Sequence, residues 1–293
     1  MTPYGKSLME YTYFSTSFGT FRTLVSLAQH PSSQTKDLRP EPVDLWDDFL
    51  TAFFSRDALT PSSLQALFEP IRHPSVDAML VVAQLGQTID GRIATITGQS
   101  KYINGQSGLM HLHQLRALLD AVVVGVGTVL ADNPQLNVRL VKGRHPARVV
   151  IDPKGRLGPD ARIWADDGAR RIWIVSESLE VSAPKGVEVI ALPANEGRIE
   201  PPLILQRLSD TGLKRILIEG GAETVSRFLQ AGCLDRLHMI VAPIIMGSGR
   251  ASFNLPAIEH MDQALRLNIH THLIGKEVLF DCDLSTQRVK ITA

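Results

Sequence analysis

The chain of 293 residues has few cysteines: only Cys233 and Cys282, neither of them in a CxxC or other metal-ligand spacing. Two such thiols are typical of reduced, buried cysteines in a cytoplasmic protein, and a disulfide between them is the less favoured alternative. The 30 basic and 30 acidic residues give a formal net charge of zero. The chain therefore has no excess of basic residues that would indicate a nucleic acid or an anionic membrane as a partner. The chain also lacks an apolar run of ~20 residues that would span a bilayer, and its N-terminus lacks the apolar core of a signal peptide.

Several catalytic motifs are missing as well. There is no Walker A motif, no GxSxG elbow, and no HxE followed by PCxxC, which argues against nucleoside triphosphatases, serine hydrolases and zinc deaminases. His111 and His113 are two residues apart on an expected helix, so they point in different directions. His270 and His272 would share a strand face, but no third ligand accompanies them. We therefore expect no metal site.

Residues 1–74 differ from the rest in their pattern of apolar and polar residues. They are interpreted as an N-terminal extension that covers part of the main domain or of a partner subunit. Pro31 to Pro42 reads as a loop, and Thr60-Pro61 as the start of a short helix. An amphipathic helix lies between them, because its apolar residues recur at steps of three and four: Leu45, Trp46, Phe49, Leu50 and Phe53.

Residues 75–293 alternate between apolar strands and helices. Strands are expected at 78–85, 120–126, 148–152, 171–176, 187–192, 214–219 and 236–243, with two more around the turn Gly275-Lys276. Helices are expected at 105–119, 201–211 and 220–232, the first with Asn104 as N-cap and one apolar face: Leu109, Leu112, Leu115 and Leu119. This pattern predicts an α/β fold with a mainly parallel sheet, flanked by helices, and a C-terminal antiparallel hairpin.

Three segments are candidates for ligand binding, each with a structural alternative. Glu219-Gly220-Gly221 ends a strand and opens a helix, which suits a phosphate or simply a tight turn. The segment LGQTIDGRIA holds the turn dipeptide Asp90-Gly91, at a strand end or in an ordinary hairpin. GVGTVLADNPQLNVR is either a capped connection or a polar set for a sugar phosphate, with Thr128, Asp132 and Arg139.

Taken in order, these segments resemble the 5-amino-6-(5-phosphoribosylamino)uracil reductase family of riboflavin biosynthesis. The resemblance covers about Met79 to Leu284 and rests on LGQTIDGRIAT, GQSKYI, LRALLDAVVVGVGTVLADNPQLNVR, RVVID, ILIEGGAE and LQAGCLDRL…VAPIIMGSG. It implies a dihydrofolate-reductase-like fold, a homodimer, NADPH as hydride donor, and a small pyrimidine ribosyl phosphate that is reduced to its ribityl product. The alternative is a reductase of the same fold for another pterin- or pyrimidine-like substrate such as dihydrofolate.

The resemblance also implies roles for individual residues. The cofactor-binding positions are Gly86, Tyr102, Thr128, Asp132 and the pyrophosphate segment Gly220, Gly221, Ala222, Glu223 and Thr224, which extends to about Arg227. The substrate-binding positions are Ser100, Arg116, Leu136, Arg139 and Glu219. Asp90 or Glu219 is a candidate for proton transfer, and Lys154 and Arg156 are candidates for contacting a 2′-phosphate. The chain departs from many bacterial members at Gln84, Tyr102 and Asn137, where Lys, Trp and Thr are common.

Overall fold

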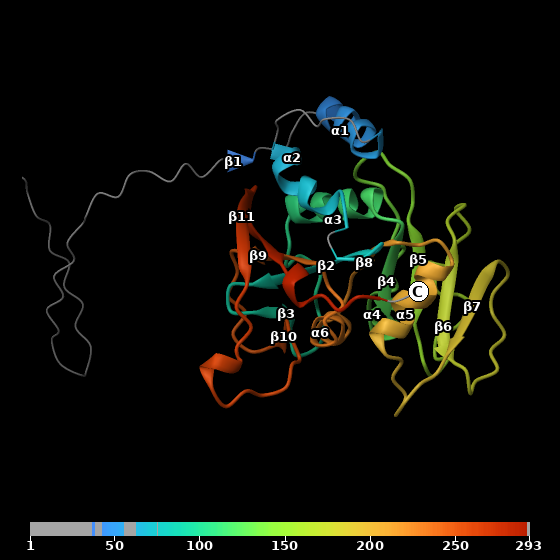
Figure 1. The fold of residues 1–293 in the computed structure, drawn as a ribbon. Coiled ribbons are helices and arrows are strands. Elements are labelled where there is room, and N and C mark those ends of the chain that lie inside the picture. Colours follow the sequence, from blue (N-terminus) through green and yellow to red (C-terminus); the bar gives the residue numbers. More distant parts are fainter. Residues whose placement is uncertain (1–36, 39–42, 56–62, 75, 292–293) are drawn as a thin grey trace, which may run out of the picture. The chain divides into compact units, whose positions relative to one another are not determined.

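The nine apolar runs predicted as strands, together with the short strand β1, form one ten-stranded sheet in the computed structural model, which describes residues 37–38, 43–55, 63–74 and 76–291 (Figure 1). The order is β1-β11-β12-β9-β2-β8-β4-β5-β6-β7. The strands are β1 (Asp37–Leu38), β2 (Leu80–Thr88), β4 (Ala121–Gly125), β5 (Ala147–Ile151), β6 (Arg171–Ser176), β7 (Val187–Leu192), β8 (Arg215–Ile218), β9 (Arg236–Ala242), β11 (Asn268–Ile274) and β12 (Glu277–Asp283).

Strand direction follows the sequence pattern. From β9 through β7 all neighbours are parallel, whereas β12 runs antiparallel to both β9 and β11. The mainly parallel sheet and the C-terminal hairpin are therefore confirmed, and the turn Gly275-Lys276 joins β11 to β12. Two short strands, β3 (Arg92–Ala94) and β10 (Arg250–Ala251), pair separately.

Helices cover both faces of the sheet (Figure 1). They are α1 (Val43–Ser55), α2 (Ser63–Phe68), α3 (Gln106–Leu118), α4 (Val126–Asp132), α5 (Pro201–Asp210) and α6 (Ala222–Gln230), with 3-10 turns at Glu69–Ile71, Arg162–Trp164, Met261–Gln263 and Ser285–Gln287. Successive strand residues point to opposite faces. Val82 and Val124 accordingly pack with α1 to α4, while Val81 and Val123 pack with α5 and α6.

Helices α1 and α2 belong to the sheet's hydrophobic core, although they lie in the predicted extension. Trp46, Phe49 and Phe68 are each at most 6% exposed and join the same cluster as α3. The Phe68 ring stacks on His111 of α3, with centroids 5.4 Å apart. Trp46 donates a hydrogen bond from Nε1 to the carbonyl oxygen of Lys142 at 2.8 Å. The described part of the extension is thus held against α3, and the domain boundary at residue 74 stays a prediction.

Several local predictions need correction or fall outside the described residues. Asp37–Leu38 forms β1 inside the predicted loop of residues 31–42, whose other residues are not described, and neither is the predicted cap at Thr60. Helix α3 has Gly105, not Asn104, at its N-cap. Its predicted apolar face is also wrong at Leu109, which is 46% exposed, because α3 lies between the sheet and α1–α2 and buries His111 and Leu118 instead.

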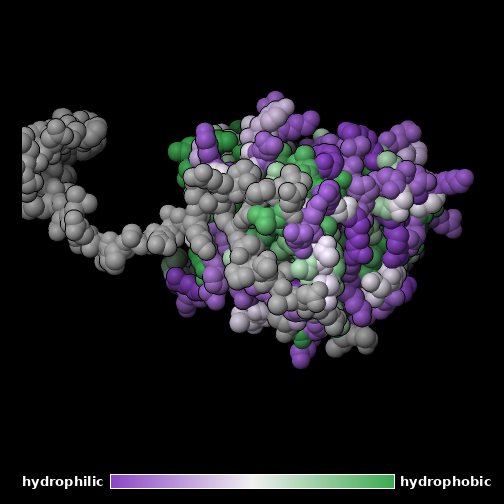
Figure 2. Space-filling view, turned by 90° about the horizontal axis from the view of Figure 1, so that it is seen from above, coloured by the Kyte–Doolittle hydropathy of each residue, from purple (hydrophilic) through white to green (hydrophobic). Residues whose placement is uncertain are grey.

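The two helical histidines point in different directions, as expected. His111 Nε2 lies 3.0 Å from His238 Nδ1 of β9, and His113 Nδ1 accepts a hydrogen bond from the backbone nitrogen of Arg139. Within the described ranges, no cluster of three His, Cys, Asp or Glu side chains is arranged to hold a metal ion. No described helix is long and apolar enough to cross a membrane. On the side that carries α1 and α2, small hydrophobic areas alternate with hydrophilic ones (Figure 2).

Candidate active site

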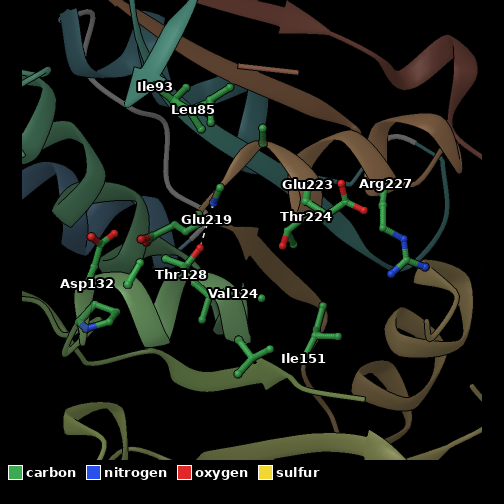
Figure 3. Close-up of a pocket in the computed structure, with 18 of the residues that line it drawn as sticks. Leu85, Ile93, Val124, Thr128, Asp132, Ile151, Glu219, Glu223, Thr224 and Arg227 are labelled. Atoms are coloured by element: carbon green, nitrogen blue, oxygen red, sulfur yellow. Dashed lines mark hydrogen bonds between the residues drawn. The ribbon is translucent and has the colours of Figure 1, made fainter. Parts of the chain in front are cut away.

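A pocket of about 770 Å³ opens at the carboxyl ends of the central parallel strands. Gln84 to Gly86 of β2, Val124 and Gly125 of β4, and Ile151 of β5 line it, together with the segment after β8. Figure 3 shows Thr128, Asp132, Glu219, Glu223, Thr224 and Arg227 around this space. Strand ends of this kind are where open α/β sheets bind ligands, and the volume suits a cofactor-sized molecule.

The turn from β8 into α6 approaches α4 so closely that it requires glycine. Gly220 has a φ of +117°, and a Cβ there would lie 2.8 Å from Thr128 Oγ1. The Gly221 nitrogen donates a hydrogen bond to the same oxygen at 3.0 Å (Figure 3). A Cβ on Gly125 would lie 2.5 Å from Thr224 Oγ1. The first N–H groups of α6 have no acceptor inside the helix and carry the positive end of its dipole, so this turn is suited to phosphate.

A buried ion pair beside the glycine turn also lines the pocket. Arg116 donates from Nε and Nη2 to the two oxygens of Glu219, both at 2.7 Å, and from Nη1 to the carbonyl oxygen of Asn137 at 3.1 Å. Both charged side chains are only 6% exposed. A bidentate geometry of this kind offsets part of the cost of removing two charges from water. A ligand in the pocket therefore contacts the two paired side chains together, not a separate guanidinium or carboxylate.

Most of the residues that resemblance assigns to the site line this one pocket. The cofactor-binding candidates in its wall are Gly86, Thr128, Asp132, Gly220, Gly221, Ala222, Glu223 and Thr224, and the substrate-binding candidates are Ser100, Arg116, Leu136 and Glu219. Tyr102 and Arg139 are not in the wall. Tyr102 is 91% exposed, and Arg139 donates from Nη1 to Asn137 Oδ1 at 2.9 Å.

The segment around Arg139 is held by a neutral histidine. The pKa of His113 is lowered to about 3, first by burial and then by the charges of Arg116 and Arg139. The neutral ring accepts from the Arg139 backbone nitrogen at 3.1 Å. Leu136, close by, is buried at a φ of +52°, an unusual conformation for leucine that surrounding contacts must maintain.

Asp90 lies outside the pocket wall and ties two loops together. Its carboxylate accepts hydrogen bonds from Thr88 Oγ1 at 2.6 Å and from the backbone nitrogens of Met246 and Gly247 at 3.0 and 2.6 Å. These bonds, that from Thr88 foremost, lower the pKa of Asp90 to about 2. The geometry favours the turn-capping interpretation, while the catalytic one stays a prediction.

Other pocket residues were not predicted to line it. Arg198, Arg250 and Asn254 are in the wall, as is Asn104. Arg198 follows β7 in a turn closed by a bridge to Asn195, and Arg250 is brought to the wall by pairing of β10 with β3. No local motif marks these positions, because their place depends on loops that meet only in the fold. Arg156 is also in the wall, whereas Lys154 is not.

Comparison with known proteins gives a consistent family. The riboflavin biosynthesis protein RibD of Actinobacillus pleuropneumoniae is 35% identical over 209 residues, 69% of this chain and 56% of that protein. The 2,5-diamino-6-ribosylamino-4(3H)-pyrimidinone 5′-phosphate reductase of Methanothermobacter thermautotrophicus is 34% identical over 211 residues, 69% of this chain and 96% of that protein. The chain thus spans little more than half of the RibD protein but nearly all of the archaeal reductase.

Solved structures agree with this comparison. The diaminohydroxyphosphoribosylaminopyrimidine deaminase/5-amino-6-(5-phosphoribosylamino)uracil reductase of Thermotoga maritima matches with a TM-score of 0.62 and 31% identity, covering 70% of this chain and 56% of that one. The riboflavin biosynthesis reductase Rib7 of Saccharomyces cerevisiae matches with a TM-score of 0.63 over 76% of this chain and 99% of that one, at 19% identity, which speaks for the fold alone. The predicted reductase fold is confirmed. Residues 79–280 match the RibD C-terminal domain, and the chain belongs to that family.

Proposed function

We propose that the protein is an oxidoreductase of riboflavin biosynthesis that uses NADPH to reduce the ribosyl group of 5-amino-6-(5-phosphoribosylamino)uracil, or of its undeaminated precursor, to the ribityl product. The observation that carries the proposal is the single pocket that joins the glycine turn before α6 to the Arg116–Glu219 pair. The archaeal relative, named a reductase for such a pyrimidine ribosyl phosphate, supports the substrate class.

The pocket fits a dinucleotide at the start of α6. Gly125, Gly220 and Gly221 leave backbone exposed there, and a Cβ on either of the first two would strike a threonine hydroxyl. Arg227, further along α6, also lines the pocket and donates from Nη2 to the carbonyl oxygen of Ile199 at 2.9 Å. These residues would hold the pyrophosphate. A bound nicotinamide cofactor supplies the hydride that the reduction requires.

NADPH rather than NADH is favoured by cations on the β5 side of the pocket. Arg156 and Arg198 both line it there, and each offers a guanidinium to a 2′-phosphate. Arg156 is only loosely engaged, with its Nε 3.9 Å from the buried carboxylate of Asp152. We therefore assign these two residues, in place of Lys154, to recognition of the 2′-phosphate.

Ser100, Arg116 and Glu219, in the same pocket, would bind and orient the pyrimidine substrate. Ser100 donates from Oγ to Asp132 Oδ1 at 3.5 Å, and Arg116 and Glu219 lie side by side. The guanidinium offers charge to a phosphate or hydroxyl, and Glu219 is the nearer candidate for handling a proton because Asp90 is outside the wall. Closing such a site around both ligands excludes water from the reacting carbon.

We further propose that the protein is a homodimer. Five large hydrophobic side chains of the segment from residue 245 to β11 are exposed by 45% or more: Ile245, Ile258, Met261, Leu265 and Ile269. Exposed apolar side chains concentrated in one segment are typical of interaction surfaces. Light scattering on the purified chain measures its mass directly, and a monomer at micromolar concentration would contradict the proposal.

The decisive experiment follows absorbance loss at the nicotinamide band with purified protein, NADPH, and each pyrimidine ribosyl phosphate in turn. Rapid oxidation with either substrate supports the proposed function and identifies the preferred ring. Dihydrofolate serves as the control substrate for the alternative reaction, and NADH as the control donor. Tight binding of NADPH without oxidation by either pyrimidine would contradict the proposed substrate.

A further inference from the structure

A buried carboxylate at the start of β12 joins the first turn of α3 to the pocket. Glu277 is 4% exposed and accepts three hydrogen bonds, each of 2.9 Å: from Asn104 Nδ2 and Gly105 N at Oε1, and from Gly108 N at Oε2. Gly105, the N-cap residue, has no side chain that could cap the helix. Glu277 therefore does from a distant strand what an N-cap side chain does locally, and its charge suits the helix dipole.

Glycines make room for this contact on both sides. A Cβ on Gly108 would lie 2.9 Å from Glu277 Oε2, and a Cβ on Gly275 would lie 2.6 Å from Ser107 Oγ. Gly275 also has a φ of +65°, which a side chain would disfavour. The turn between β11 and β12 thus fits tightly against the first turn of α3, and the position of Glu277 is well defined.

The same carboxylate determines which atom of the Asn104 amide is turned toward β2. Glu277 accepts from Nδ2, so the amide oxygen must point the other way, because a flipped amide would set oxygen against oxygen. Oδ1 lies against Gly86, only 1.6 Å from where a Cβ on that residue would be. Asn104 and Gly86 both line the pocket, and no hydrogen bond found among the described residues is donated to Oδ1. The pocket wall therefore presents a fixed acceptor beside a residue without a side chain.

We propose that Asn104 Oδ1 accepts a hydrogen bond from a planar N–H donor of the ligand that lies against Gly86, and that Glu277 is its positioning residue. The inference rests on the proposed function. Two ligands of that function carry such a donor: the carboxamide of the nicotinamide ring, and the amino and ring N–H groups of the pyrimidine. The absence of a side chain at Gly86 makes room for the amide oxygen itself, because Oδ1 occupies the place that a Cβ would take.

The test compares wild type, Asn104→Ala and Glu277→Gln. Asn104→Ala leaves the Glu277 bonds to Gly105 and Gly108 in place, so the helix start is retained. We expect it to weaken binding of one ligand roughly 3- to 10-fold, the value of one neutral hydrogen bond. Gln206→Ala is the matched control, because it removes a comparable amide–carboxylate contact, to Asp210, from the surface of α5. It should change neither binding constant.

Two arms identify the donor. In the first, NADPH is compared with its 3-acetylpyridine analogue, which lacks the amide N–H group. If the carboxamide is the donor, the analogue binds wild type more weakly than NADPH does. In Asn104→Ala the two cofactors then bind equally well. In the second, the KM of each pyrimidine is measured at saturating NADPH, and a rise in Asn104→Ala without a change in NADPH binding assigns the donor to the substrate.

The role of Glu277 is tested by combining the two variants. If it acts through Asn104, Glu277→Gln raises the same constant as Asn104→Ala, and the double variant shows no further rise. Unchanged binding of both ligands in Asn104→Ala, or a fully additive effect of Glu277→Gln, would overturn the inference while leaving the reductase activity of wild type intact. A wild-type chain that neither binds nor oxidises NADPH would instead remove the proposed function, and the inference with it.

Discussion

Arg116→Met is expected to lower the free energy of unfolding by about 3–5 kcal/mol, because it leaves the Glu219 carboxylate buried without its cation. The magnitude follows from burial. Both side chains of the pair are 6% exposed, and the guanidinium makes two bonds of 2.7 Å to the carboxylate and one of 3.1 Å to a carbonyl oxygen. An ion pair in water is worth only about 0–1 kcal/mol. Most of the expected decrease in the free energy of unfolding therefore comes from the desolvation of Glu219, and less of it from the lost attraction to Arg116.

The chain provides a matched control on its surface. Arg170 and Glu188 form the same bidentate pair, at 2.9 and 2.8 Å, and Arg170 also donates to the carbonyl oxygen of Thr211. Their side chains are 39% and 47% exposed. Arg170→Met should therefore cost about 1 kcal/mol or less. Urea unfolding at pH 7, with the slope of the transition checked against wild type, measures both variants.

The double variant Arg116→Met with Glu219→Leu completes the test. Replacing a buried ion pair by apolar side chains is often nearly neutral for stability, so the double variant should regain most of what Arg116→Met loses. Equal losses in Arg116→Met and Arg170→Met would refute the reasoning. So would a double variant that is no more stable than Arg116→Met alone.

Two further perturbations test the loops and the N-terminal helices. Asp90→Asn separates catalysis from turn capping: we expect turnover within a few-fold of wild type and faster proteolysis near Met246 and Gly247, whereas a loss of 100-fold or more would support general acid–base catalysis. Because the pKa of Asp90 is lowered to about 2, its contribution to stability is full above the unfolded value near pH 4 and disappears as the pH falls through 2. Phe68 is fully buried, and Phe68→Ala should cost about 3–5 kcal/mol in urea unfolding. A cost below about 1 kcal/mol would show that α2 is only loosely attached.

The arrangement of strands was predictable because its signals are local. Continuous apolar runs mark β4, β5 and β6, and Gly212 and Gly232 end the helices that precede β8 and β9. Each signal concerns neighbouring residues and one backbone conformation. The pocket residues at strand ends were predictable for the same reason, once their succession resembled a family.

Contacts between distant segments were not predictable in this way. Arg116 and Glu219 were both assigned to the substrate, but nothing in the sequence shows that they pair across 103 positions. Asn104 is a residue type that is preferred at helix N-caps, yet the cap comes from Glu277, 173 residues away. Leu109 fits an apolar helix face, but α1 and α2 pack on the opposite side of α3 from the sheet and change which residues are buried. Tertiary packing overrides local pattern in each case.

Local backbone signals and contacts between distant segments correspond to two different proposed roles of the pocket residues. In the proposed complex, backbone N–H groups would hold the pyrophosphate, and the glycines of that turn, Gly220 and Gly221, can be identified in the sequence. The proposed recognition of a ring would instead depend on the side chain of Asn104, whose orientation is set by Glu277 elsewhere in the chain. A homologue that keeps the glycines but changes Asn104 or Glu277 should therefore bind the same phosphates and differ in its choice of ring.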